Sequence, residues 1–130
     1  MSNSIKLANK NFLSSLDISS EEFLHILEIA KNFKNKDLNI ELKDKVLGLI
    51  FDKSSTRTRV SFQVAMSRLG GTTVDLNPTT SQIGRGEPIS DTARVLSRYC
   101  DVLAIRTFKQ SDKKSTQNGL LSQLLMPLQT

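Results

Sequence analysis

The stretch FDKSSTRTRVSF, residues 51–62, marks the passage from a buried strand to a helix. It continues the apolar run VLGLIF at residues 46–51, which is typical of a strand covered on both faces. Residues 52–59 are all polar, and apolar residues then recur at helical spacing as far as Gly70-Gly71, a natural helix end. Because ligands of open α/β sheets bind at the carboxyl ends of the strands, this junction is the predicted binding site.

The residue types at the junction favour an anion. Ser55, Thr56, Arg57 and Thr58 fall at the predicted start of the helix, where unpaired N–H groups and the positive end of the helix dipole attract negative charge. Hydroxyl groups and a planar guanidinium add donors, so we predict a small phosphate-bearing ligand. Hydroxyl residues also cap helices without binding any ligand, and spacing alone leaves that structural role open.

The rest of the chain predicts an α/β fold. Ser19 and Glu22 form a predicted capping box that opens an N-terminal helix. Beyond the junction, a strand at 72–76, a helix capped by Ser90 and a strand at 101–106 are predicted. This order, a helix and then β-α-β-α-β, is typical of a three-layer α/β domain with a parallel sheet.

Arg106 ends the third predicted strand, at the same edge of the sheet as the junction. A guanidinium at the end of a buried strand is best explained by a ligand in the crevice beyond it. We therefore expect Arg57 and Arg106 to converge on one anion.

Composition excludes several other classes. The 130 residues carry a net charge of +5, and the seven arginines all fall between Arg57 and Arg106. With one Tyr, no Trp and no basic run interleaved with aromatics, a nucleic-acid partner is not expected. One Cys and one His cannot form a zinc finger, and no apolar run approaches the length of a membrane span. The single Cys100 and the polar N-terminus favour the cytoplasm.

Three ordered motifs carry a resemblance to a known family. Residues 51–62 closely resemble the carbamoyl-phosphate motif of the aspartate and ornithine carbamoyltransferases. Residues 81–87 (SQIGRGE) and 91–99 (DTARVLSRY) are similar to ornithine carbamoyltransferases in particular, since the aspartate enzymes usually carry Lys in the loop that holds Gln82 here. The resemblance runs from about Leu13 to Arg106 or Phe108, with Gln63 standing where the family usually has Glu.

The resemblance implies a reaction in which the δ-amine of ornithine attacks carbamoyl phosphate, giving citrulline and phosphate without a metal or an organic cofactor. It implies that the family's homotrimer brings the loop of Gln82 into a neighbouring subunit's site, and that Arg57 and Arg106 act in catalysis. The residues implied to bind carbamoyl phosphate are Ser55, Thr56, Arg57, Thr58, Gln82 and Arg106.

Beyond residue 108 the sequence stops resembling the family, and a His-Pro-x-Gln segment that supplies further ligands there is absent. We therefore expect a partial carbamoyl-phosphate-binding domain over 1–108, incomplete at its C-terminus, and a divergent tail over 109–130. With the ornithine-binding domain absent, we expect the chain to be inactive alone. Two alternatives remain: a transferase for acetylornithine, succinylornithine or putrescine, and a non-catalytic phosphate-binding module that partners a full-length transferase.

Overall fold

A computed structural model describes residues 11–37, 39–51, 55–77 and 89–106. Its contacts divide the chain into two compact units, Met1–Ile40 and Glu41–Thr130. The predicted tail at 109–130 and the loop that holds Gln82 lie outside the described residues.

The first unit contains a 3-10 helix, η1 (Ser15–Asp17), and the helix α1 (Ser20–Lys34). The predicted capping box of α1 is confirmed. The Ser19 hydroxyl accepts from the Glu22 N–H at 3.1 Å, and the Glu22 carboxylate accepts from the Ser19 N–H at 2.8 Å. Two donors that the start of a helix leaves unpaired are thereby satisfied within the helix itself.

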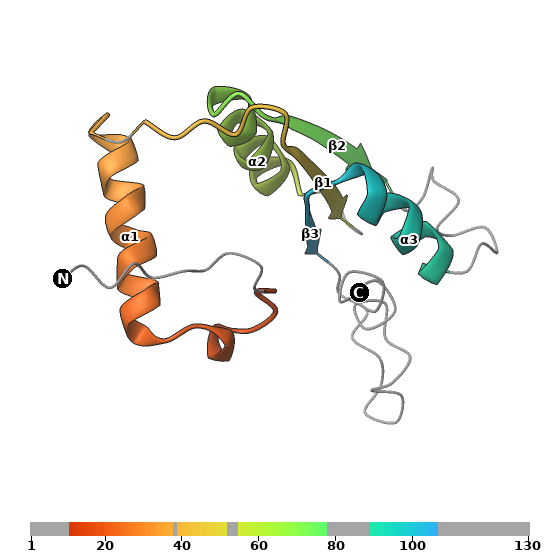
Figure 1. Cartoon of the computed structure of the whole chain (residues 1–130), viewed down its shortest axis with the longest axis horizontal. Helices are drawn as coiled ribbons and strands as arrows, with labels where there is room; N and C mark the ends of the chain where they lie inside the picture. Colours follow the sequence, from red (N-terminus) through yellow and green to blue (C-terminus); the bar gives the residue numbers. More distant parts are fainter. Residues whose placement is uncertain (1–10, 38, 52–54, 78–88, 107–130) are drawn as a thin grey trace. The chain divides into compact units, whose positions relative to one another are not determined.

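The second unit is built on a three-stranded parallel sheet (Figure 1). Its strands are β1 (Val46–Phe51), β2 (Thr72–Leu76) and β3 (Val102–Arg106), and β1 lies in the centre between the other two. Two helices connect them: α2 (Thr56–Arg68) joins β1 to β2, and α3 (Ile89–Tyr99) precedes β3. The predicted β-α-β-α-β order and the parallel sheet are confirmed.

Alternate residues of β1 face two different helices, which makes the three predicted layers. Leu47, Leu49 and Phe51 form one cluster with Met66 of α2. Ile50 forms the other with Ala93 and Leu96 of α3, as the period of two along a strand requires. Burial on both faces explains why the strand reads as a continuous apolar run.

The ends of the two connecting helices test two further predictions. Gly70 follows the last turn of α2 with φ +82°, a conformation that glycine adopts without strain, so the predicted helix end is confirmed. The predicted cap at Ser90 is wrong: α3 begins at Ile89, so Ser90 lies inside its first turn.

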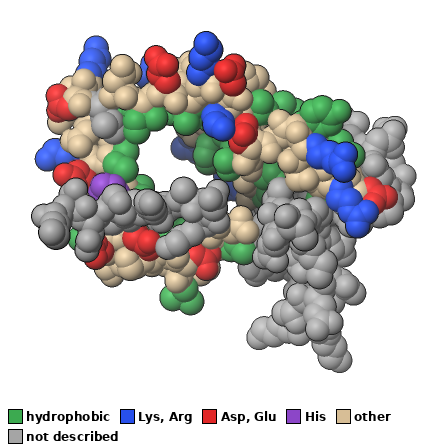
Figure 2. Space-filling view, in the orientation of Figure 1, with side chains coloured by type: hydrophobic (Ala, Val, Ile, Leu, Met, Phe, Trp, Pro, Cys, Tyr) green, Lys and Arg blue, Asp and Glu red, His purple; other side chains and the backbone are tan. Residues whose placement is uncertain are grey.

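Large hydrophobic side chains stay at the surface in both units. Among those exposed are Phe23, Leu24 and Leu27 of α1 and Val60 of α2. On the face that Figure 2 shows, such green side chains lie between interspersed basic and acidic ones. None of the helices among the described residues combines the length and the apolar character needed to cross a membrane.

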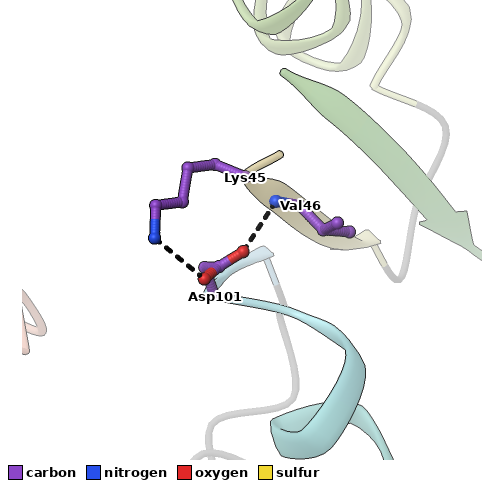
Figure 3. A network of polar contacts seen from close by, with 3 residues as sticks. All are labelled: Lys45, Val46 and Asp101. Atoms are coloured by element: carbon purple, nitrogen blue, oxygen red, sulfur yellow. Dashed lines mark hydrogen bonds and ion pairs between the residues drawn. The ribbon is translucent and has the colours of Figure 1, made fainter. Parts of the chain in front are cut away.

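Asp101 fastens the amino-terminal edge of the sheet (Figure 3). Its Oδ2 accepts from the Val46 N–H at 2.8 Å, and its Oδ1 lies 3.4 Å from the Lys45 ammonium. The Asp101 N–H in turn donates to the Val46 carbonyl at 2.9 Å. The hydrogen bond from Val46, and then the charge of Lys45, lower the pKa of the Asp101 carboxyl below its ordinary value.

This lowered pKa predicts an acid-dependent loss of stability that Asp101→Asn should remove. A carboxyl whose pKa is lower when folded stabilises the fold above its unfolded pKa of about 3.9, and the contribution is lost as the pH falls through the folded value. The melting temperature of Asp101→Asn should therefore be lower than that of the wild type at pH 7. The two should approach each other as the pH falls through the lowered pKa of Asp101, where its carboxyl becomes uncharged as the amide is. A difference in melting temperature that stays constant as the pH is lowered from 7 through the acid range would contradict this role of the charge.

Candidate anion site

The carboxyl-terminal edge of the sheet brings the predicted site residues together. Phe51, the last residue of β1, is the register partner of Arg106, the last residue of β3. The chain leaves β1 there and enters α2 at Thr56. Parallel pairing therefore places Arg106 beside the start of α2, because both strands end at the same level.

The side chain of Arg106 reaches the first turn of α2. Its Nη1 donates to the Ser55 hydroxyl at 2.5 Å and to the Thr58 hydroxyl at 3.1 Å. Ser55 is buried, and its carbonyl accepts from the Arg59 N–H at 2.9 Å, which closes the first helical turn. A guanidinium from one strand thus fixes two hydroxyls at the beginning of the helix.

Ser55 occupies the N-cap of α2, yet its side chain forms no capping hydrogen bond. The Ser55 hydroxyl accepts from Arg106 instead. The Ser55 hydroxyl therefore does not satisfy the amide groups of the first turn, whereas the Ser19 hydroxyl does so in α1. Amides in this state are the donors that helix starts offer to anions.

The charge around the start of α2 is also unlike that of the other helices. The first turn of α1 contains Glu21 and Glu22, and that of α3 contains Asp91, whereas the first turn of α2 contains no acidic residue. Carboxylates in the first turn partly neutralise the positive end of a helix. The start of α2 therefore keeps its positive end and adds the cations of Arg57 and Arg106.

The structure brings some of the predicted site residues into contact and leaves others untested. It brings Arg106, Ser55 and Thr58 into contact. Thr56 and Arg57 lie in the same turn with exposed side chains, and the convergence of Arg57 and Arg106 on one anion stays a prediction. Gln82 lies outside the described residues.

Asp75 is a charged neighbour of this turn that the sequence did not single out. Its Oδ2 lies 2.9 Å from Nε of Arg59, and the guanidinium carbon of Arg59 lies 5.5 Å from the centre of the Phe51 ring. Asp75 belongs to β2 and carries no motif of its own. The pairing of β1 with β2 brings it to Arg59, and no local spacing signals that contact.

The other reactive side chains that the structure describes form no second centre. Cys100 is buried, and burial, followed by the neighbouring Asp101 charge, raises the pKa of its thiol, which disfavours the reactive thiolate form. Within the described part of the chain, no group of three or more His, Cys, Asp or Glu residues is placed to hold a metal ion.

The site occurs in a recognised family. Residues 10–125 match the family model of the aspartate/ornithine carbamoyltransferase carbamoyl-P binding domain. The chain belongs to this family. The match continues past residue 108, so the domain boundary that we placed there remains a prediction.

Named relatives agree on the ornithine branch. The chain is 80% identical over 107 residues to ornithine carbamoyltransferase of Prochlorococcus marinus subsp. pastoris, covering 82% of this chain and 35% of the relative. Its identity to the ornithine carbamoyltransferase of Parasynechococcus marenigrum is 63% over 106 residues, covering 82% and 33%. The chain thus spans about a third of the length of the curated relatives it matches.

Solved carbamoyltransferases share the fold. Anabolic ornithine carbamoyltransferase from Campylobacter jejuni matches with a TM-score of 0.76 at 36% identity, covering 91% of this chain and 36% of that one. Aspartate transcarbamoylase from Trypanosoma cruzi, in complex with carbamoyl aspartate and phosphate, matches with a TM-score of 0.73 at 29% identity, covering 89% and 35%. The predicted α/β class and the family resemblance are therefore confirmed.

Proposed function

We propose that this chain supplies the carbamoyl-phosphate-binding part of an ornithine carbamoyltransferase. The observation that carries the proposal is the 80% identity to a named ornithine carbamoyltransferase. The contact of Arg106 with Ser55 and Thr58 at an uncapped helix start supports the same ligand. Solved ornithine carbamoyltransferases match at up to 49% identity and solved aspartate transcarbamoylases at up to 36%, which favours ornithine as the acceptor.

The chemistry suits fixed donors. The δ-amine nitrogen of ornithine forms a bond to the carbamoyl carbon, the bond from that carbon to the phosphate oxygen breaks, and the amine loses a proton. Negative charge grows on the carbonyl oxygen and on the departing phosphate. Amides, hydroxyls and guanidiniums held in place stabilise both charges, and one such donor is commonly worth about 3–4 kcal/mol. Ser55, Thr56, Arg57 and Thr58 would bind the phosphate, and Arg106 the carbamoyl end.

Under the same proposal, activity would also require an ornithine-binding part and neighbouring subunits. Ornithine would bind to a part of the enzyme that the matched third of the relatives does not include. In the assembled enzyme, a homotrimer, Gln82 would complete the site of a neighbouring subunit. Citrulline production would place the reaction in arginine biosynthesis.

Titration calorimetry of the 130-residue chain with carbamoyl phosphate tests the proposal. We expect saturable binding that excess inorganic phosphate competes away, because the start of α2 binds the phosphate group. We also expect no citrulline above background when ornithine is added, since the acceptor site is not in the matched part. Absence of binding would refute the proposed ligand, and citrulline formation at the rate of a full-length relative would refute the inactivity of the chain alone.

A further inference from the structure

Arg59 links the first turn of α2 to a second strand. Its backbone N–H closes that turn on the Ser55 carbonyl at 2.9 Å. Its side chain leads to β2, where Nε lies 2.9 Å from Oδ2 of Asp75. The Arg59 side chain is 24% exposed and the Asp75 side chain 32%, so solvent screens this ion pair less than a fully exposed one.

An aromatic side chain completes the fixation of Arg59. The guanidinium lies over the Phe51 ring at 5.5 Å, within the range of a cation–π interaction. Phe51 is itself buried at the end of β1, and its ring centre lies 6.3 Å from that of Phe62 on α2. The guanidinium is thus held by a carboxylate on one strand and by a ring on the next.

Two arginines therefore hold one helical turn from opposite sides of the central strand. Arg106 fastens Ser55 and Thr58 to β3, and Arg59 fastens the same turn to β2. Donors that are fixed before a ligand arrives bind it more tightly, because little freedom is lost on binding. An anion site made of backbone amides depends on this fixation, since the amides move with the helix that carries them.

We propose that Arg59 and Asp75 are a positioning pair that holds the first turn of α2 in the geometry that binds phosphate. The pair acts through the turn and not as a ligand of its own. This inference rests on the proposed function, and it adds two residues to which neither the sequence motif nor the family resemblance gave a role.

Asp75→Asn tests the pair because it removes the charge and keeps the shape of the side chain. In calorimetry with carbamoyl phosphate, we expect the Kd of the variant to rise about tenfold over that of the wild type. The Kd for inorganic phosphate should rise by a similar factor, since both ligands use the same amides. Asp75→Glu restores the carboxylate and should return the Kd to within about threefold of the wild type.

Asp101→Asn is the matched control. It breaks an ion pair of the same sheet at the opposite, amino-terminal edge. Its Kd should equal that of the wild type even though its melting temperature falls. A rise in Kd in both variants would show a general effect of stability and overturn the proposal, as would equal affinities of Asp75→Asn and the wild type.

Arg59→Lys provides a second measurement in case Asp75→Asn does not fold. It keeps a cation for Asp75 but lacks the planar group that lies over Phe51, so we expect a smaller rise in Kd, about threefold to fivefold. Wild-type affinity in Arg59→Lys would overturn the role of the guanidinium. Failure of the wild type to bind carbamoyl phosphate would instead refute the proposed function, and this inference with it.

Discussion

Calorimetry should detect no binding of carbamoyl phosphate to the Arg57→Ala variant. Arg57 lies in the first turn of α2 with an exposed side chain, beside amides that the Ser55 hydroxyl does not cap. Removing it takes away a planar cation of the turn that is proposed to bind phosphate, where a guanidinium can donate two parallel hydrogen bonds. Because the side chain is exposed and forms no part of either core cluster, its loss should leave the fold intact.

Arg68→Ala is the control for this variant. Arg68 ends the same helix, and its side chain is also exposed, so its removal lowers the net charge equally. We expect Arg68→Ala to bind carbamoyl phosphate as the wild type does, apart from a small uniform change in attraction that salt abolishes. Equal affinities of Arg57→Ala and the wild type would refute the assignment of the phosphate site.

The strands could be predicted from the sequence because buried strand positions require apolar residues. The run 46–51 is apolar at every position except Gly48, and the structure explains both facts. Leu49 and Ile50 are buried on opposite faces of the sheet. A Cβ at Gly48 would lie 2.6 Å from a Leu103 methyl and 3.1 Å from the Cys100 sulfur, so β3 and the residue that follows α3 approach too closely for a side chain there.

The junction could be predicted for a different reason. The junction is a polar run between a buried strand and a helix. In a parallel sheet, such a run lies at the carboxyl edge of the sheet. Topology then brings Arg106 to the same edge, and the contact with Ser55 and Thr58 confirms that placement. The prediction stops at the contacts themselves. The sequence did not indicate the hydrogen bonds from Arg106 to the Ser55 and Thr58 hydroxyls, and the convergence of Arg57 and Arg106 on one anion stays a prediction.

Long-range charge pairs could not be predicted. Asp75 reaches Arg59, and Asp101 reaches Lys45 and Val46, only after the strands have paired in register. A lone acidic residue in a strand pattern looks like any solvated side chain. The same limit applies to Ser90, whose residue type suggests a cap although the helix starts one residue earlier.

Replacement of Arg106 by alanine should weaken the binding of carbamoyl phosphate about 100-fold, which corresponds to about 3 kcal/mol. The variant loses a cation at the site and leaves the buried Ser55 hydroxyl without its donor, so the first turn of α2 is also less well held. Two effects therefore contribute, one on the ligand and one on the turn.

Arg106→Lys and Ser55→Ala separate these two effects. Lysine keeps the charge but has no planar group with which to reach both hydroxyls, so it should recover part of the affinity and little of the fixation. Ser55→Ala removes one hydroxyl and keeps the guanidinium. If Arg106 acts partly through Ser55, the double variant Arg106→Ala, Ser55→Ala should lose less affinity than the two single losses combined. Additive losses would mean that Arg106 acts on the ligand independently of Ser55, and wild-type affinity in Arg106→Ala would remove this arginine from the site.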